Sequence, residues 1–226
     1  MRNFRVTTKL SLLLFALIIL AAAGAGWLVK QERSAALRDR QHAHLTETAG
    51  AAARQLTENL DFLRREVRFL AELPPIQGII RARANGGVDP RSGSSEAEWK
   101  ARLTKIFTGF LETRPGYFQV RFIGTAENGR ELVRVQRSDG AIEVVEAADL
   151  QQKGDRDYFR NALRLDPGQV YLSEINLNQE HGRVAPAHTA TLRAAVPVFD
   201  RRGEVFGAIV INEDMGRRLE ALRASL

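Results

Sequence analysis

One uncharged apolar run, residues 10–29, sets the strongest limit on how this chain folds. Its 20 residues include no Asp, Glu, Lys, Arg or His. A helix rises about 1.5 Å per residue, so the run matches the roughly 30 Å hydrocarbon core of a bilayer. Basic residues stand on both sides of it: Arg2, Arg5, Lys9, Lys30 and Arg33. The run predicts a transmembrane anchor over residues 10–29.

The flanking charges leave the orientation of this anchor open, because both sides are basic. A long domain is usually translocated regardless of its charge. We therefore expect a cytoplasmic basic tail over residues 1–9, a single pass through the inner membrane, and a main domain in the periplasm or outside the cell. A cleaved signal peptide is the alternative, with an apolar core over 10–20 and a small-residue motif over 21–23 or 23–25, which would release a secreted basic binding protein.

Composition excludes several classes of function. The chain has 226 residues, a net charge of +6 and a pI of about 10.1. Its basic residues are interleaved with acids along the whole chain, so we expect no nucleic-acid partner. The absence of cysteine excludes disulfides, thiolate metal sites and cysteine nucleophiles. Excess arginine outside a membrane suits an anionic small ligand or a lipid-headgroup surface.

Residues 30–73 have the composition of one long helix, with no proline and a single glycine, Gly50. Apolar residues recur at alternating steps of four and three, which places them on one stripe. The stripe contains Ala49, Ala53, Leu56, Leu60, Leu63, Val67 and Leu70. It either packs along the chain's own domain or forms the seam of a homodimer, and both are compatible for different stretches. Pro74 and Pro75 end the helix.

After residue 74 the pattern changes to short helices and paired strands. Ser95 and Glu98 fit a capping box for a helix that runs to about Thr113. Alternating apolar residues between turns predict strands over 117–123, 130–137, 142–145, 170–177, 191–199 and 205–212. A short helix over 155–165, a polar loop over 178–186 and a final helix over 214–226 complete the chain. Adjacent hairpins predict an α+β fold with an antiparallel sheet flanked by helices.

Four stretches in this order resemble a known family. They are residues 153–159 (KGDRDYF), 168–178 (GQVYLSEINLN), 192–198 (LRAAVPV) and 207–212 (GAIVIN). Together with an anchor and a long helix that leaves the membrane, they resemble the membrane-distal lobe of double-Cache sensors, which have a PAS-like sheet. The resemblance implies a Cache-like sensor domain over residues 74–213. Such sensors are found on histidine kinases and diguanylate cyclases.

The chain departs from the family pattern at its end. Family members continue into a second lobe, a second transmembrane helix and a cytoplasmic output domain, whereas this sequence ends at Leu226. We expect either a chain truncated before the second lobe or a free-standing sensor fragment.

Candidate ligand-binding residues come from two sources. Arg121 and Arg134 fall on adjacent predicted strands amid apolar residues, and arginine's planar fork suits a carboxylate or phosphate. Each of them alternatively points to solvent or pairs with Glu131 or Glu143. Four further candidates lie in the family-like stretches: Tyr158, Tyr171, Asn176 and Arg193.

Acidic residues near predicted helix starts have a simpler reading. Asp155 and Asp214 are expected to cap the helices that follow them, because carboxylates are favoured at helix N-termini. Asp214 is alternatively a partner for a ligand's amino group.

Catalysis has little support in the sequence. His42 and His44 point to different sides of a helix, and His181 and His188 lie in a loop with few acids nearby, so no metal site is expected. No phosphate-binding loop or catalytic motif occurs, and we expect neither an enzyme nor a cofactor.

The sequence as a whole predicts an extracytoplasmic sensor module that binds a small anionic or zwitterionic ligand. The alternatives are a chemoreceptor-type sensor and a ligand-free membrane-anchored dimerisation or scaffold protein.

Overall fold

The computed structural model describes residues 3–225, without the side chains of residues 3–10, 12, 26, 28, 29, 31–43 and 225. The side chains of the basic tail and of His42 therefore lie outside this description. The chain divides into two compact units, Met1–Arg54 and Gln55–Leu226. Helix α1 (Asn3–Ala71) supplies the described residues of the first unit and opens the second. Within the described residues, none of the helices has a segment both long and apolar enough to cross a bilayer.

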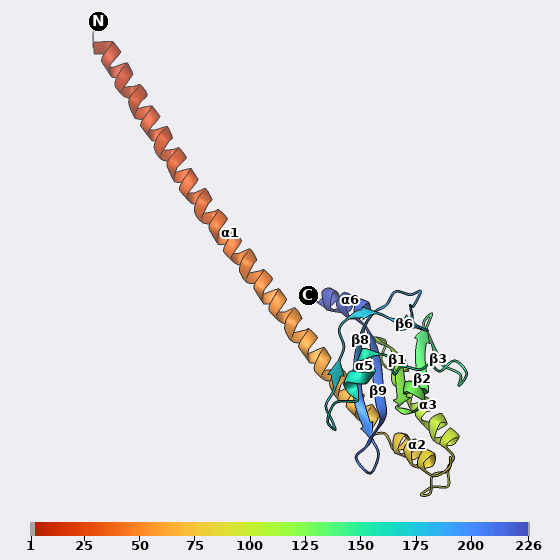
Figure 1. Cartoon of the computed structure of the whole chain (residues 1–226). Coiled ribbons are helices and arrows are strands. Elements are labelled where there is room, and N and C mark those ends of the chain that lie inside the picture. Colours follow the sequence, from red (N-terminus) through yellow and green to blue (C-terminus); the bar gives the residue numbers. More distant parts are fainter. Residues whose placement is uncertain (1–2, 226) are drawn as a thin grey trace. The chain divides into compact units, whose positions relative to one another are not determined.

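The second unit is an α+β domain built on one antiparallel sheet (Figure 1). Its helices after α1 are α2 (Pro74–Ala84), α3 (Glu96–Glu112), α4 (Ala126–Gly129), α5 (Asp157–Ala162) and α6 (Met215–Ser225). The strands of the main sheet are β1 (Tyr117–Gly124), β2 (Glu131–Ser138), β3 (Ala141–Val144), β4 (Tyr171–Leu172), β5 (Asn176–Leu177), β8 (Ala190–Phe199) and β9 (Val205–Asp214). Their order is β3-β2-β1-β9-β8-β4, and β5 also pairs with β8. A separate small hairpin joins β6 (Gln179–Glu180) to β7 (Arg183–Val184).

The two faces of the sheet carry different chemistry. One face packs against α1, α2 and α3 in the main apolar core, where Leu63, Phe107 and Ile209 are completely buried. The opposite side of the sheet is covered by α5 and holds a smaller apolar cluster together with buried arginines. Because strand residues alternate between faces, each of the central strands β1, β8 and β9 contributes to both.

The part of the apolar stripe of α1 that lies in the second unit packs within that unit. Leu63, Val67 and Leu70 are at most 1% exposed and belong to the main core, and Leu56 and Leu60 pack against it. Over these residues the interpretation of a helix that packs along its own domain is therefore confirmed.

Helix ends follow the expected signals in most places. Ser95 and Glu98 form the predicted capping box of α3, and the Asp214 carboxylate accepts hydrogen bonds from the backbone N–H groups of Gly216 and Arg217 at the start of α6. The expectation for Asp155 is wrong. Helix α5 begins at Asp157, its N-cap residue is Arg156, and no side chain caps it. Asp155 is instead largely exposed, with one oxygen 3.7 Å from Arg156 Nε.

Three expectations from the sequence need correction. The alternation over 117–123 predicts that Tyr117 shares a face with Gln119 and Arg121. A β-bulge between Tyr117 and Gln119 instead places Tyr117 in the helix-side core, where its ring stacks on Phe110. The single strand expected over 170–177 is two short strands, β4 and β5. The polar loop expected over 178–186 contains the β6–β7 hairpin, which has too few residues to show an alternating pattern.

Candidate functional site

A cavity of about 410 Å³ lies between α5 and the sheet. Strand β8, the β4–β5 segment and the entry to the β6–β7 hairpin supply its other walls. Its lining residues are Arg121, Arg156, Asp157, Tyr158, Asn161, Tyr171, Ser173, Glu174, Asn176, Asn178, Gln179 and Arg193. The lining is therefore mostly polar and contains three arginines.

The register of the sheet brings two of these arginines to the same face. On β9, Val210 pairs with Arg121 of β1, and Asn212 pairs with Arg193 of β8. Val210 and Asn212 are two residues apart, so their partners point to the same side of the sheet. Arg121 is 1% exposed and Arg193 is 5% exposed. Both guanidinium groups thus enter the cavity from the sheet.

Tyr158 on α5 connects the two arginines. The central guanidinium carbons of Arg121 and Arg193 each lie 5.4 Å from the centroid of its ring, within the range of cation–π contacts. Burial raises the pKa of the Tyr158 hydroxyl, although both arginines oppose this shift. The ring is therefore a neutral platform between two buried cations.

Arg193 lacks a close carboxylate partner among the described residues. Its Nη1 donates to Asn176 Oδ1 at 2.7 Å, and its Nη2 lies 3.4 Å from Asn178 Oδ1. Burial, with added repulsion from Arg121, lowers the pKa of Arg193 to about 10, so this side chain remains charged at neutral pH. Two amide oxygens accept hydrogen bonds from it without neutralising its charge.

Arg121 is only partly satisfied. Its Nη2 donates to Asn212 Oδ1 at 2.9 Å and its Nη1 lies 3.4 Å from Glu131 Oε1, but its buried Nε has no partner within the described structure. An unpaired buried donor is costly, and native structures leave few of them.

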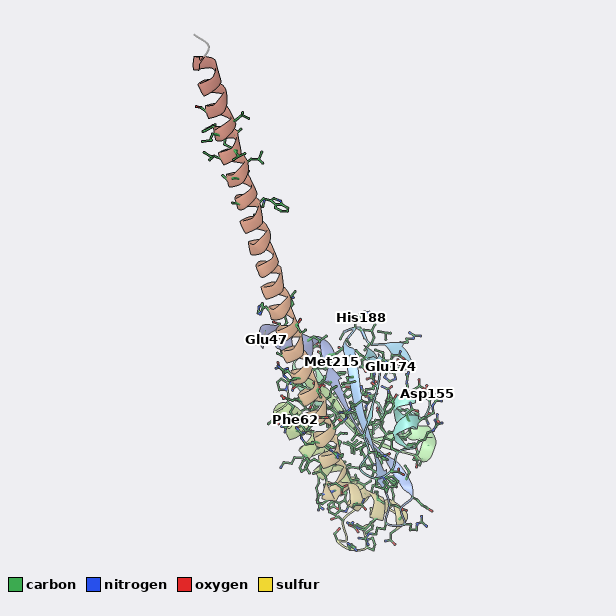
Figure 2. All side chains as sticks on the ribbon, turned by 90° about the vertical axis from the view of Figure 1, so that its left-hand side faces the viewer. Glu47, Phe62, Asp155, Glu174, His188 and Met215 are labelled. Carbon is green, nitrogen blue, oxygen red and sulfur yellow. The ribbon has the colours of Figure 1, made fainter. Side chains whose placement is uncertain are left out.

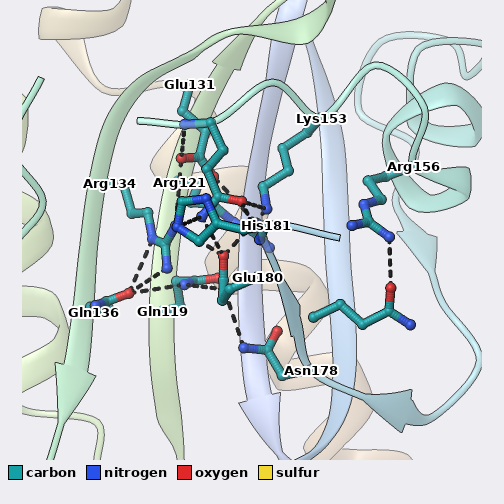
Figure 3. Close-up of polar contacts among 12 residues, drawn as sticks. Gln119, Arg121, Glu131, Arg134, Gln136, Lys153, Arg156, Asn178, Glu180 and His181 are labelled. Carbon is teal, nitrogen blue, oxygen red and sulfur yellow. Dashed lines mark hydrogen bonds and ion pairs between the residues drawn. The ribbon is translucent and has the colours of Figure 1, made fainter. Parts of the chain in front are cut away.

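A buried ionic cluster adjoins the cavity on the same face (Figure 3). Glu180, at the tip of β6, lies 3.0 Å from Arg134 Nη1 and 3.3 Å from Lys153 Nζ. Glu131 belongs to the same cluster, with its carboxylate oxygens 3.7 Å from Arg134 Nη1 and 3.4 Å from Arg121 Nη1. Burial disfavours the charge of Glu180, but Arg121, Arg134 and Lys153 outweigh it and hold the pKa of this carboxyl well below its usual range.

The β1–β2 turn places Lys153 in this cluster. Gly129 has φ +74°, and a Cβ there would lie 2.5 Å from the backbone nitrogen of Gly154, so only glycine allows this approach. The Lys153 N–H donates to the Gly129 carbonyl at 2.8 Å. The turn and the segment before α5 are thereby held side by side.

Lys153 should make the stability of the protein depend on pH. Burial and the neighbouring Arg121 lower its pKa from 10.5 to about 8. Between these two values the unfolded chain binds more protons than the folded one, so the free energy of unfolding rises with pH. We expect a rise of about 3 kcal/mol over this window, measured by urea denaturation. A Lys153→Met variant should lose this rise, and an equal slope in both proteins would contradict the assignment.

Five of the six candidate residues from the sequence line this cavity: Arg121, Tyr158, Tyr171, Asn176 and Arg193. Arg134 is placed in the ionic cluster instead, where Gln136 Oε1 accepts from its Nη2 at 2.6 Å. Both Arg121 and Arg134 approach Glu131, as the alternative reading of these residues expected. A ligand role for each of the six residues remains a prediction.

Sequence reasoning missed several residues of the site. Asn161 donates to the Tyr171 hydroxyl at 3.2 Å, and Gln179 accepts from Arg156 at 2.8 Å. Asp157 and Glu174 lie on exposed positions at the rim of the cavity. Figure 2 labels Glu174 at the surface of the domain. A polar residue four positions after Asp157 on a short helix was the available signal for Asn161.

The described residues contain no group of three or more His, Asp or Glu side chains arranged to hold a metal ion. The side chains that line the cavity instead include guanidinium, amide and phenol groups.

Comparison with known proteins agrees with this fold. A family model described as the sensor domain of bacterial histidine kinases matches residues 91–226. No curated protein matches the chain. The extracellular domain of vpHK1S-Z8, described as a histidine kinase, is 19% identical with a TM-score of 0.64, covering 78% of this chain and 58% of that chain. A domain of a protein described as sensory box/GGDEF from Vibrio parahaemolyticus is 20% identical with a TM-score of 0.62, covering 75% and 58%.

A third similar structure contains a ligand. It is the ligand-binding domain of the Campylobacter jejuni chemoreceptor Tlp3 in complex with 4-methylisoleucine, 13% identical with a TM-score of 0.50, covering 76% of this chain and 56% of that chain. The present chain thus spans less than two thirds of the length of these solved structures. Because the family model covers more than half of the sequence, the chain belongs to the family of bacterial histidine kinase sensor domains.

Proposed function

We propose that this chain is the extracytoplasmic ligand-sensing module of a membrane-bound receptor of the histidine kinase or diguanylate cyclase type. The observation that carries the proposal is the cavity of about 410 Å³ into which two buried arginines point. Guanidinium groups at this depth suit a carboxylate or phosphate. The ligand is therefore a small anionic or zwitterionic molecule held between α5 and the sheet.

The ligand-free scaffold is the less supported alternative. A domain that served only for dimer contacts would gain stability from a collapsed, apolar interface between α5 and the sheet. Here the apolar contact of α5 with the sheet is limited to the smaller cluster, and beside it lies a polar cavity with an unpartnered buried Arg121 Nε. The complex of Tlp3 with 4-methylisoleucine, an amino acid, gives a precedent for a small ligand in this fold.

A membrane anchor over residues 10–29 and a homodimer complete the proposed receptor. Among the described side chains of this run, the large apolar ones, such as Leu13 and Ile18, are more than half exposed, as suits contact with lipid. Phe62 and Phe69 lie seven residues apart on α1 and are 45% and 63% exposed, which fits a helix seam between two copies. We expect the chain to remain in alkali-washed membranes and to crosslink there as a dimer. Release of the chain from the membrane by alkali would contradict the anchor. A chain that crosslinks only as a monomer would contradict the helix seam.

Ligand binding is tested on the full chain with a panel of carboxylates, phosphates and amino acids, with the melting temperature as readout. We expect at least one compound to raise the melting temperature, since a ligand at a hundred times its Kd stabilises by about 2.7 kcal/mol. Arg193→Met should remove the effect. Arg164→Met, at an exposed arginine just beyond α5, is the matched control and should retain it. A panel without any stabilising compound would contradict the proposed function.

A further inference from the structure

Buried positive charge exceeds buried negative charge on the α5 face of the sheet. Arg121, Arg134, Lys153 and Arg193 are each at most 5% exposed. The described carboxylates close to them are Glu131, which is 1% exposed, and Glu180, whose side chain is 19% exposed. Four cations therefore face two carboxylates.

The two carboxylates form ion pairs within the ionic cluster that adjoins the cavity. Glu180 pairs with Arg134 and Lys153, and Glu131 lies between Arg134 and Arg121. Arg193 makes its described side-chain hydrogen bonds to amide oxygens, and Arg121 keeps an unpartnered Nε. The surplus charge is thus concentrated where Arg121 and Arg193 line the cavity.

Uncompensated buried charge is expensive, with an effective penalty of several kcal/mol per ion. Such a group either loses its charge or gains a counter-ion. Arginine cannot lose its charge at neutral pH, because its pKa remains far above 7 even when burial lowers it. A molecule that brings negative charge to Arg121 and Arg193 therefore removes an existing penalty.

The cavity offers little to an ammonium group. Among its described lining residues, the carboxylates are Asp157 and Glu174, and both lie on exposed positions of the rim. The side chain of Asp157 is 82% exposed, and Arg160 already binds it. A buried amino group would instead meet the arginines, and this repulsion costs affinity.

We propose that the cavity selects a small organic anion with two negative charges and no amino group, either a dicarboxylate or a phosphate monoester. This inference rests on the proposed function and narrows it. It separates this chain from the chemoreceptor domain whose structure contains an amino acid. One negative charge would neutralise Arg193, and the other would lie against the guanidinium of Arg121, which also lines the cavity.

Titration calorimetry of the full chain with matched compounds tests the selection. Succinate is compared with L-aspartate, which adds an amino group, and with butyrate, which lacks one carboxylate. Glycerol 3-phosphate is compared with phosphoethanolamine. We expect succinate or glycerol 3-phosphate to bind at least tenfold more tightly than its matched compounds. Whichever of the two binds more tightly shows whether the ligand is a dicarboxylate or a phosphate monoester.

An isosteric variant tests the charge argument at one atom. Asn176 Oδ1 already lies 2.7 Å from Arg193 Nη1, so Asn176→Asp places a carboxylate there without changing the shape of the site. Asn176 is exposed, and the variant should fold. Affinity for the dianion should fall at least tenfold, whereas Asn85→Asp, in the exposed loop after α2, should leave it unchanged.

The outcomes separate the inference from the function on which it rests. Tighter binding of aspartate or phosphoethanolamine, or of butyrate, would overturn the inference and leave a ligand-binding cavity. Binding of a monoanion or of an amino compound from the panel, abolished by Arg193→Met, with no binding of any amino-free dianion, would do the same. No binding of any compound would overturn both.

Discussion

Replacing Arg193 by methionine should abolish ligand binding while leaving the ligand-free protein as stable as before, or more stable. Arg193 is 5% exposed, carries a charge and is held by amide oxygens. Substituting a poorly compensated buried charge by an apolar side chain of similar length is commonly neutral or stabilising by about 1–4 kcal/mol. Loss of its charge-assisted bonds to a buried anion costs about 2–5 kcal/mol of affinity, or a factor of roughly thirty or more.

This opposite response distinguishes a binding residue from a structural one. The free energy of unfolding is measured by urea denaturation without ligand, and affinity by calorimetry with the tightest compound of the panel. A variant that binds normally would contradict the proposed role. A variant that loses both binding and several kcal/mol of stability would show that Arg193 supports the fold rather than the ligand.

Replacing Glu131 by glutamine should destabilise the domain by about 3 kcal/mol, a shift of roughly 10 °C in melting temperature for a domain of this size. The Glu131 side chain is completely buried and lies within 4 Å of Arg121 and Arg134. Its second oxygen accepts from the Gln151 backbone N–H at 2.9 Å, and glutamine can retain this bond through its own carbonyl oxygen. The variant therefore removes the charge and leaves the shape.

Glu143→Gln is the matched control for this variant. Glu143 lies on β3, on an exposed position of the strand that pairs with β2, and its neutralisation should change stability by less than about 0.5 kcal/mol. Equal stability of the two variants would mean that the buried cluster contributes little. Glu131→Gln should also leave the affinity for an anion undiminished, because it increases the surplus of positive charge beside the cavity.

Local patterns in the sequence predicted the parts of the site that lie on regular strands. Alternation along β1 and β2 indicated that Arg121 and Arg134 share a sheet with apolar neighbours, and both are buried there. The face of Tyr117 was predicted wrongly because a bulge inserts one extra residue into the strand. The pattern of apolar and polar residues in the sequence does not show where such a bulge occurs. The resemblance to Cache sensors supplied Tyr158, Tyr171, Asn176 and Arg193, which strand alternation alone did not single out.

The ionic cluster could not be predicted in the same way. Glu180 lies in a strand of two residues, and its partners Arg134 and Lys153 are distant in the sequence. Nothing local distinguishes this glutamate from one in a solvated loop. Its burial depends on the β6–β7 hairpin crossing the sheet face, which is a property of the tertiary structure.

The most direct test of the account is a crystal structure of the chain with the tightest-binding dianion. We predict one anionic group on the Arg193 guanidinium, the other on the Arg121 guanidinium, and the ligand enclosed between the Tyr158 ring and the sheet. A ligand outside this cavity, or one whose charged groups avoid both arginines, would contradict it.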